Sequence, residues 1–480
     1  MWWLLWAVPT AALAVFVCLL LIRAMRFTPP AAADAQAEPL TVDTARATDT
    51  LAALVRCKTV SYRDKSLEDE AEFQRLISLL PTLYPNVART VTMEQLPDRA
   101  LLFHWRGREA GAPTVLMAHY DVVPASAELW SHDPFDATVR DGYLWGRGTL
   151  DTKVTMNGIL LAADTLIAEG FTPKCDVYFA FSGGEEVNGE GAVRIVEHFA
   201  ERGIEPSLVL DEGGAVVEGV FPGVKAPCGL IGIAEKGMMD VRYTARSTGG
   251  HASAPKPNAP VDRLCRVCDR VLKKPPRMHL TAPVAQMFDT LGRHSSFVYR
   301  LIFANLFVFA PVLNLLAKKS GGEMNALLRT TVAFTQMQGS AASNVIPPEA
   351  SLVSNIRLNP ADTMDGMLTH LTDCADDASV TLSVMAGMNP SRISRTDTEG
   401  YERVAAAVRD TWRGCIVSPY LMVQCSDARH WGRISDRVYR FSAMDLTSAE
   451  RATIHGNDER IRIDCLARSV EFFLRLIRSC

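Results

Sequence analysis

The chain has 480 residues, of which 48% are hydrophobic and 22% are charged, and its formal net charge is −4. This is an ordinary globular composition with enough length for two or three domains with substantial cores, so it excludes a largely disordered protein. No run of lysines or arginines stands out, and the small negative charge argues against a surface that binds nucleic acid.

The first element in chain order is an apolar run from Trp2 to Ile22 without a charged side chain. It is long enough to cross a bilayer as a helix, and Arg23 and Arg26 follow it. A signal peptide would carry positive charge before a shorter apolar core, although Ala31 and Ala33 resemble a cleavage site. We expect an uncleaved membrane anchor. The positive-inside rule, applied to only two charges, would place the rest of the chain in the cytoplasm.

The segment 27–49 is rich in alanine, proline and threonine, which is typical of a linker. From residue 50, short apolar runs alternate with helical stretches, and this alternation predicts an α/β domain with a mostly parallel sheet. The predicted strands and helices are Thr114–Ala118, Thr155–Ala168, Asp176–Phe181, Ala192–Arg202 and Leu208–Leu210. In such a domain the functional residues lie at the carboxyl ends of the strands.

A different pattern begins near Met238 and has the order β-α-β-β-α-β, which predicts a ferredoxin-like α+β unit. Its elements are Met239–Ala245, Pro260–Leu272, Leu328–Gln336, Ser351–Leu358, Ala361–Cys374 and Val380–Val384. After Arg395 the α/β pattern returns and ends in the amphipathic helix Asp464–Ile477. The predicted domains are therefore an anchor (1–26), a linker (27–49), an α/β domain in two parts (50–237 and 395–480) and an inserted lid or dimerisation domain (238–394).

Within the inserted unit, Leu301–Ala317 is strongly apolar and is interrupted only by Asn305, Pro311 and Asn314. A second membrane span is one interpretation. Its modest length, flanking basic residues and position inside a compact domain favour a buried or substrate-facing helical insertion. Packing in the core is the simplest explanation, whereas an exposed segment would form an apolar wall for a lipid-like substrate.

The eleven cysteines are scattered along the chain. Only Cys265 and Cys268 lie close together, and no second pair has zinc-ribbon spacing, so one helix face explains them. Because the sequence shows no disulfide framework, it does not indicate whether the protein resides in an oxidising or a reducing compartment.

Carboxylates or imidazoles recur where the predicted strands of the α/β domain end. His119 and Asp121 follow the first strand, where an aspartate can orient an imidazole that faces a metal, although an isolated pair of this kind is more often structural. Asp151 lies in a glycine-rich turn before a helix, a position that is also typical of a helix cap.

The adjacent Glu185 and Glu186 are harder to explain as purely structural. Neighbouring carboxylates after a buried strand repel each other, and this repulsion is tolerated when a cation lies nearby. Asp211 follows the next strand, and His455 lies near the end of the chain.

These five motifs resemble, in order and spacing, those of the M20 metallopeptidases. The resemblance extends from about Thr50 to the C-terminus, and it is strongest to the branch that contains Gly-X carboxypeptidases and N-acyl amino acid hydrolases. It implies a zinc-peptidase-type catalytic domain that carries two Zn²⁺ ions, with Co²⁺ or Mn²⁺ as alternative ions.

The family pattern also implies a role for each motif residue. It assigns His119 and Asp211 to one zinc, Glu186 and His455 to the other, and Asp151 to both as the bridging carboxylate. Asp121 would orient His119. Glu185 would be the general base that takes a proton from water and passes it to the leaving nitrogen.

The inserted domain contributes further candidates by the same resemblance. His251, after Gly249 and Gly250, would donate to the oxyanion of the tetrahedral intermediate, although the residues alone indicate only a flexible turn. Arg357, Asn344 and Arg429 are candidates for binding a substrate carboxylate, because arginine can form two parallel hydrogen bonds to one. A surface strand arginine is the alternative for Arg357. Gln424 and Cys425, before Arg429, depart from the family's glycine and threonine and leave substrate selection open.

The sequence thus predicts a di-zinc, carboxypeptidase-like hydrolase that cleaves the amide bond next to a free-carboxylate amino acid in small peptides or N-acyl amino acids. One alternative is an N-deacylase of the acetylornithine or succinyl-diaminopimelate type, but those enzymes are typically soluble. A non-catalytic binding ectodomain is another, but every expected ligand position is filled. The expected partners are the substrate and a membrane, with a homodimer as a further candidate. The resemblance favours the extracytoplasmic side of the membrane for the catalytic domain.

Overall fold

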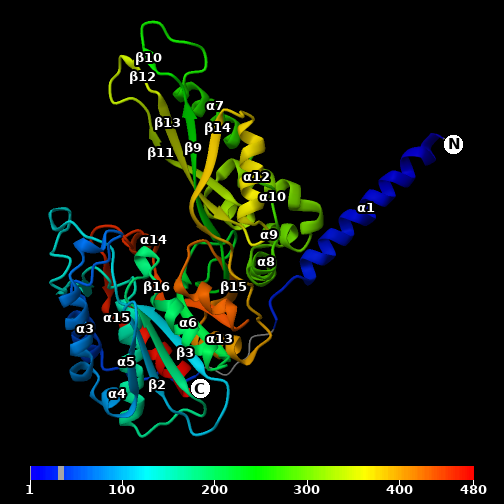
Figure 1. Cartoon of the computed structure of the whole chain (residues 1–480). Coiled ribbons are helices and arrows are strands. Elements are labelled where there is room, and N and C mark those ends of the chain that lie inside the picture. Colours follow the sequence, from blue (N-terminus) through cyan, green and yellow to red (C-terminus); the bar gives the residue numbers. More distant parts are fainter. Residues whose placement is uncertain (1, 31–36) are drawn as a thin grey trace.

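The computed structural model describes residues 2–30 and 37–480. An α/β domain carries an elongated second domain on one side, and the helix α1 (Trp2–Arg26) projects from the body (Figure 1). Within the described ranges α1 is the one helix that is long and apolar enough to span a membrane by itself. Ala31 and Ala33 lie outside the described residues.

The α/β domain is built on an eight-stranded sheet with the order β1-β2-β6-β3-β7-β16-β8-β15. Its strands are β1 (Thr92–Leu96), β2 (Ala100–Trp105), β3 (Thr114–His119), β6 (Val177–Ser182), β7 (Leu208–Val217), β8 (Cys228–Glu235), β15 (Ile416–Met422) and β16 (Val438–Leu446). The central strands β6, β3, β7 and β16 pair in parallel, whereas β1, β2 and β8 add antiparallel pairings. The sheet is therefore mixed, with a parallel centre.

Helices cover both faces of this sheet because its central strands are apolar on both sides. In β6, Phe179 and Phe181 face the larger core, whereas Tyr178 and Ala180 face the smaller one. The helices over the larger core are α2 (Thr44–Val55), α3 (Glu70–Leu83), α4 (Pro85–Thr90), α5 (Lys153–Ala168), α13 (Glu399–Thr411) and α15 (Ile463–Arg478). The smaller core lies under α6 (Gly191–Glu201).

The second domain has the predicted ferredoxin-like order. Its antiparallel sheet, β11-β13-β9-β14, consists of β11 (Thr331–Gln338), β13 (Glu349–Leu358), β9 (Gly237–Arg246) and β14 (Val380–Met388), and it packs on α7 (Pro260–Lys273) and α12 (Met364–Ala375). At the far tip β10 (Gly250–His251) pairs with β12 (Val345–Ile346) (Figure 1). The fold class predicted from the sequence is confirmed.

Four helices are inserted between α7 and β11, namely α8 (Ala282–His294), α9 (Phe297–Phe303), α10 (Leu306–Ser320) and α11 (Gly322–Leu328). Helix α8 packs against β8 and β15 of the main sheet, so the insertion contacts the α/β domain. The apolar segment forms α9 and α10, which meet at an angle of 106°. Only Phe303 in α9 and Ala317 in α10 are buried. The segment 301–317 therefore packs in the core only in part, and one of its faces is exposed.

A small sheet joins the last part of the chain to the middle of the α/β domain. Strands β4 (Thr138–Arg140), β5 (Tyr143–Trp145) and β17 (Arg460–Arg462) form it, and β17 follows the short helix α14 (Ser448–Arg451). The pairing of Arg460 with Trp145 places the residues before β17 beside the residues after β5. His455 and Asp151 meet for this reason.

Candidate metal centre

His119 ends the buried strand β3 and points into a cluster of carboxylates. Its Nδ1 lies 3.0 Å from the carbonyl oxygen of Asp121, which leaves Nε2 facing the cluster. Nε2 lies 2.9 Å from Oδ1 of Asp151 and 3.4 Å from Oε1 of Glu212. The imidazole is thus oriented from behind and offers one nitrogen to the site.

The Asp151 carboxylate lies between the two histidines. Its Oδ1 faces His119, and its Oδ2 lies 3.0 Å from Nε2 of His455. His455 is also 3.1 Å from Oε2 of Glu186. One carboxylate with an oxygen toward each imidazole is the arrangement that a bridge between two cations requires.

Glu185 and Glu186 lie in a 3-10 turn (Glu185–Val187) directly after β6. The fully buried carboxylate of Asp121 accepts hydrogen bonds from the backbone N–H of Glu185 at 3.1 Å and of Glu186 at 3.2 Å. Asp121 therefore fixes the turn that carries both glutamates as well as the loop behind His119. The sequence motif predicted only the contact of Asp121 with the histidine.

The structure does not bring Asp211 to His119, but brings its neighbour Glu212 there. Strand β7 continues to Val217 instead of ending at Leu210, and adjacent residues of a strand point to opposite faces. Asp211 is oriented differently from Glu212, and its carboxylate accepts a hydrogen bond from the backbone N–H of Ala428 at 2.8 Å. Glu212 faces His119 at 3.4 Å. Of the two carboxylates, Glu212 is thus the one that the structure places within 3.4 Å of His119.

The electrostatics of the cluster are those of a cation site. Burial and repulsion by Asp151 raise the pKa of Glu212 to about 8, and burial together with nearby carboxylates, Asp427 first, raises the pKa of Glu185 well above its ordinary range. Hydrogen bonds to Asp151 and Glu186 raise the pKa of His455 to about 10. A divalent cation would relieve this crowding of negative charge.

The donor set fits metal ions. Two groups of residues have ligand atoms within 4.8 Å of one another, namely His119 with Glu185 and Glu212, and His119 with Asp151 and Glu186. Imidazole nitrogen and carboxylate oxygen together are ligands that suit zinc.

Glu459 is a buried residue that organises the loop before α5, a role that its sequence motif did not indicate. Its Oε1 accepts hydrogen bonds from the backbone N–H of Gly148, Leu150 and Asp151, at 3.1, 2.7 and 3.2 Å. Its Oε2 lies 2.7 Å from Nη1 of Arg147 in a fully buried ion pair. Glu459 therefore shapes the loop that presents Asp151, and only its position just after His455 pointed toward the site.

We expect Glu459→Gln to destabilise the protein by about 3–5 kcal/mol, because the amide leaves the buried Arg147 charge without its partner. Asp98→Asn, which removes the partly exposed pair with Arg194, should cost less than about 1 kcal/mol. Thermal unfolding of both variants measures the difference. Equal unfolding midpoints would contradict this role for Glu459.

A cavity of about 620 Å³ opens above the cluster. Asp151, Glu185, Glu186, Glu212 and His455 line one end, and the rest of its wall is largely apolar, with Val217, Leu230, Met422, Val423, Met444 and Leu446. The site thus combines a strongly polar end with an apolar wall.

Of the two predicted substrate-binding arginines, Arg357 contacts a residue that lines this cavity. Arg357, near the end of β13, has Nη1 3.5 Å from Sγ of Cys425, which lines the cavity. Arg429 donates to the carbonyl oxygen of Ser426 at 2.7 Å and to Oδ1 of Asn188 at 3.1 Å. Arg429 brings positive charge near Glu185 of the cluster, but it is already engaged by these hydrogen bonds.

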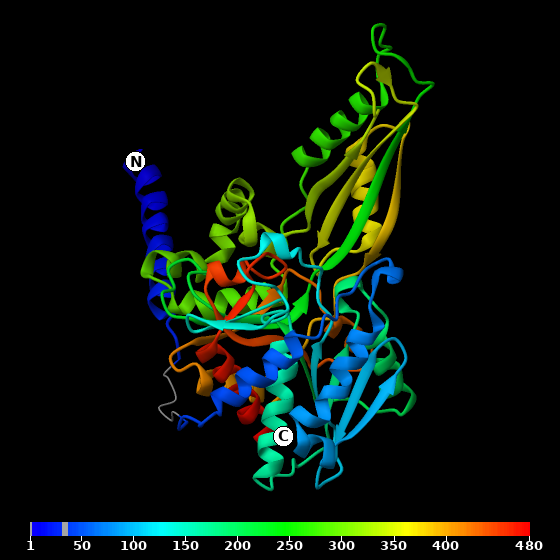
Figure 2. The same cartoon turned by 90° about the vertical axis from the view of Figure 1, so that its left-hand side faces the viewer.

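His251 and Asn344 lie together but far from the cluster. His251 belongs to β10, and the N–H of the following Ala252 donates to the carbonyl oxygen of Asn344 at 2.9 Å. Strand β10 lies at the tip of the second domain, away from β3, in both views (Figures 1 and 2). The structure therefore does not bring these two residues to the metal cluster of the same chain.

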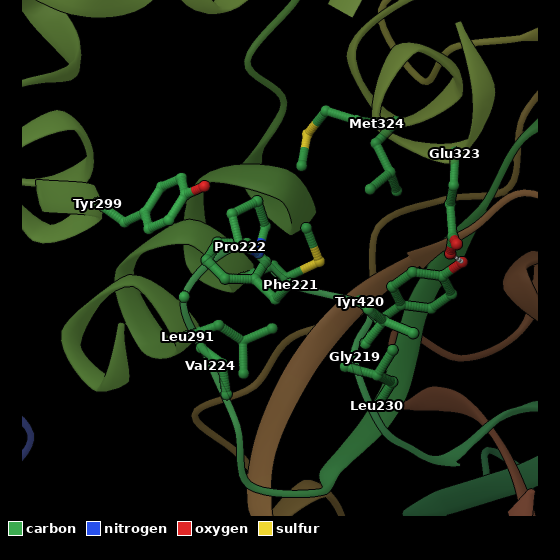
Figure 3. Close-up of a pocket in the computed structure, with 14 residues that line it drawn as sticks. Gly219, Phe221, Pro222, Val224, Leu230, Leu291, Tyr299, Glu323, Met324 and Tyr420 are labelled. Carbon is green, nitrogen blue, oxygen red and sulfur yellow. Dashed lines mark hydrogen bonds between the residues drawn. The ribbon is translucent and has the colours of Figure 1, made fainter. Parts of the chain in front are cut away.

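A second cavity, of about 510 Å³, adjoins the first and shares Leu230, Glu323 and Tyr420 with it. It extends from Tyr299 of α9, past Phe221 and Pro222, to the hydroxyl of Tyr420, which donates to Glu323 at 3.0 Å (Figure 3). Met287, Leu291 and Leu327 add apolar side chains to a wall that also carries the polar groups of Tyr299, Tyr420 and Glu323.

Comparison with known proteins gives a consistent result. The model of peptidase family M20/M25/M40 matches residues 115–479. The chain is 33% identical over 437 residues to the N-fatty-acyl-amino acid synthase/hydrolase PM20D1 of Xenopus tropicalis, covering 90% of the chain and 85% of the relative. It is 31% identical over 438 residues to a probable carboxypeptidase S-like protein 2 of Dictyostelium discoideum, covering 89% and 84%.

Solved structures share the fold at low sequence identity. An M20 family metallo-carboxypeptidase from Sulfolobus solfataricus superposes with a TM-score of 0.66 at 15% identity, covering 91% of this chain and 99% of the other. Human carnosine dipeptidase 1 gives a TM-score of 0.61 at 15% identity, with 91% and 96% covered.

Proposed function

The chain belongs to peptidase family M20/M25/M40 and is a metal-dependent hydrolase, and we propose that it cleaves the amide bond next to a free-carboxylate amino acid in N-acyl amino acids or small peptides. The observation that carries this proposal is the histidine and carboxylate cluster at one end of a largely apolar cavity. The cluster accounts for hydrolysis, and the apolar wall accounts for an acyl chain or an apolar side chain.

We propose that the cluster holds two zinc ions. His119 and Glu212 would hold one, Glu186 and His455 the other, and Asp151 would contact both. Glu212 takes the place that the family pattern assigned to Asp211. Bound ions of this kind lower the pKa of water and polarise the carbonyl group of a substrate.

Glu185 is the proposed general base, with Asp121 holding it in place. Its raised pKa suits a carboxylate that takes a proton from water and returns it to the leaving nitrogen. Asp121 accepts the backbone hydrogen bond of Glu185 and so restricts where its side chain can reach. Glu185 would thus transfer the proton itself, whereas Asp121 would hold Glu185 in position.

The substrate carboxylate is proposed to bind Arg357, which lies next to the cavity wall at Cys425. An arginine can hold a carboxylate by two parallel hydrogen bonds, which fixes the adjacent amide bond relative to the base. Arg429 would support the same end by its charge. The acyl or peptide portion would then extend along Val217, Leu230 and Met422.

His251 is kept as the proposed donor to the oxyanion, with Asn344 beside it. Because the tip that carries both residues is remote from the cluster of its own chain, they would act on the site of a second copy in a homodimer. Both side chains are exposed and free to enter such an interface.

We also propose that α1 is a retained membrane anchor. Its last turns pack against the folded body: Leu20 and Ala24 are buried, and Nη2 of Arg23 donates to the carbonyl oxygen of Ala304 at 2.9 Å. These contacts would be lost if α1 were cleaved off as a signal sequence, so they support its retention in the mature protein.

The test is hydrolysis by the zinc-loaded full chain of a panel that varies the acyl group from acetyl to oleoyl on one amino acid and includes dipeptides. We expect cleavage of N-acyl amino acids, favouring long chains, and little cleavage of analogues whose carboxylate is an amide. A chelator should abolish turnover and added zinc should restore it. Equal cleavage of the amidated analogues, or none across the panel, would contradict the proposal.

A further inference from the structure

Helices α9 and α10 leave an apolar face uncovered. Phe307, Leu315 and Leu316 are 65%, 66% and 56% exposed, and Val312 and Val298 are exposed as well. Positions 307, 311 and 315, and positions 312 and 316, are four residues apart, so they share one side of α10. Leu306, Leu313 and Ala317 contact the core instead. Helix α10 is therefore apolar on two sides, and the described part of the chain covers only one of them.

An exposed apolar face of this kind would be stabilised by a partner that covers it. Burying a large aliphatic or aromatic side chain is worth about 1.5–3 kcal/mol, and contiguous apolar patches on soluble monomers usually mark an interaction site. Apart from those of α1 and α10, exposed leucines of the described helices are scattered, such as Leu272 of α7.

The base of α1 is locked to this helix pair. Nε of Arg23 donates to Oδ1 of Asn305 at 3.0 Å, and Nδ2 of the fully buried Asn305 donates to the carbonyl oxygen of Leu20 at 3.1 Å. The Arg23 guanidinium also lies 5.2 Å from the ring centroid of Phe307. The α9–α10 pair therefore sits at the basic end of α1, where an anchor helix leaves the bilayer (Figures 1 and 2).

The helix pair has the dimensions and charge of an interfacial element. The helices have 7 and 15 residues, whereas crossing the hydrocarbon core takes about 20. Lys318 and Lys319 are exposed at the end of α10. An apolar face flanked by lysines is typical of helices that lie in the headgroup region of a membrane with anionic lipids.

We propose that the apolar face of α9 and α10 docks on the same bilayer that α1 enters. The α9–α10 pair is bound to the end of α1. The described contacts of α10 with the core are made by Leu306, Leu313 and Ala317, which lie on the side opposite to the exposed face. Docking would also place the second cavity, whose outer end is lined by Tyr299 of α9, next to the lipid. An acyl chain would then pass from the membrane through this cavity to Tyr420 and the metal centre, a consequence that rests on the proposed function.

The test is photocrosslinking of the full chain in vesicles of phosphatidylcholine and phosphatidylglycerol. Benzoylphenylalanine replaces Leu316 in one variant and Leu272 in a matched control, since the two leucines are 56% and 58% exposed near the ends of helices. We expect a lipid adduct at position 316 and none above background at position 272. Absence of the adduct at position 316, or an adduct to a second copy of the chain in its place, would overturn the proposal.

A second measurement separates this proposal from the proposed function. Leu316→Glu should lower hydrolysis of a long-chain substrate presented in vesicles while leaving hydrolysis of a soluble short-chain substrate unchanged, and Leu272→Glu should change neither. If the proposed substrates were wrong, no variant would hydrolyse either compound, yet the lipid adduct would still form. If docking were wrong, Leu316→Glu would match Leu272→Glu on both substrates.

Discussion

Glu185→Gln is expected to abolish hydrolysis while the protein keeps its bound metal. The substitution removes the group that accepts and returns the proton, and general-base catalysis is worth roughly 100- to 10,000-fold. The amide has the same shape as the carboxylate, and the backbone N–H of residue 185 still donates to Asp121. The turn that carries Glu186 should therefore stay in place, and Glu186 with it.

The measurement pairs turnover with metal content, determined by elemental analysis of the purified protein. Glu190→Gln is a suitable control, because this exposed glutamate lies next to helix α6, outside the cluster. Turnover within tenfold of the unaltered protein, together with full metal content, would exclude Glu185 as the base. Loss of metal from this variant would instead indicate that Glu185 is a ligand, as its place near His119 and Glu212 allows.

Glu212→Gln should reduce both bound metal and activity, whereas Asp211→Asn should keep most of each. Glu212 faces Nε2 of His119, but Asp211 faces the backbone N–H of Ala428, and the oxygen of an asparagine can accept that hydrogen bond as well. Removing a ligand should weaken metal binding by more than the roughly 10- to 100-fold that follows loss of a residue that only supports a ligand.

Titration of the two metal-free variants with zinc, followed by calorimetry, distinguishes the two carboxylates. Because the variants differ by one position in the same strand, general damage to β7 would affect them alike. A loss of affinity confined to Asp211→Asn would restore the ligand set that the family pattern implied. That result would require β7 to present its residues differently from the structure.

Much of the fold could be read from the sequence because it depends on local patterns. Apolar runs bounded by turns predicted β3, β6 and β9, and the β-α-β-β-α-β order predicted the ferredoxin-like sheet. The anchor run is a continuous apolar helix, α1. The boundaries proposed for the domains and the roles proposed for individual site residues remain predictions.

Two placements could not be read from the sequence. The side on which Asp211 and Glu212 project depends on how far β7 continues and on its pairing with β16, which shifts register next to these residues. The distance of His251 from the cluster depends on how the whole second domain extends from the first. Local sequence patterns determine neither the direction of the Asp211 and Glu212 side chains nor the distance of His251 from the cluster.

The sequence by itself determined the chemistry of this protein, because metal ligands and a base must be particular residue types, and these recur at the ends of predictable strands. Tertiary structure alone decided which of two adjacent carboxylates faces His119, and that Glu459 holds the Asp151 loop by accepting three of its backbone N–H groups and by pairing with Arg147, 312 residues away in the chain. It also decided that one face of the apolar segment 301–317 lies exposed at the base of α1. The physical reason is the same in each case: composition and spacing specify what a residue can do, whereas its partners are set by long-range packing.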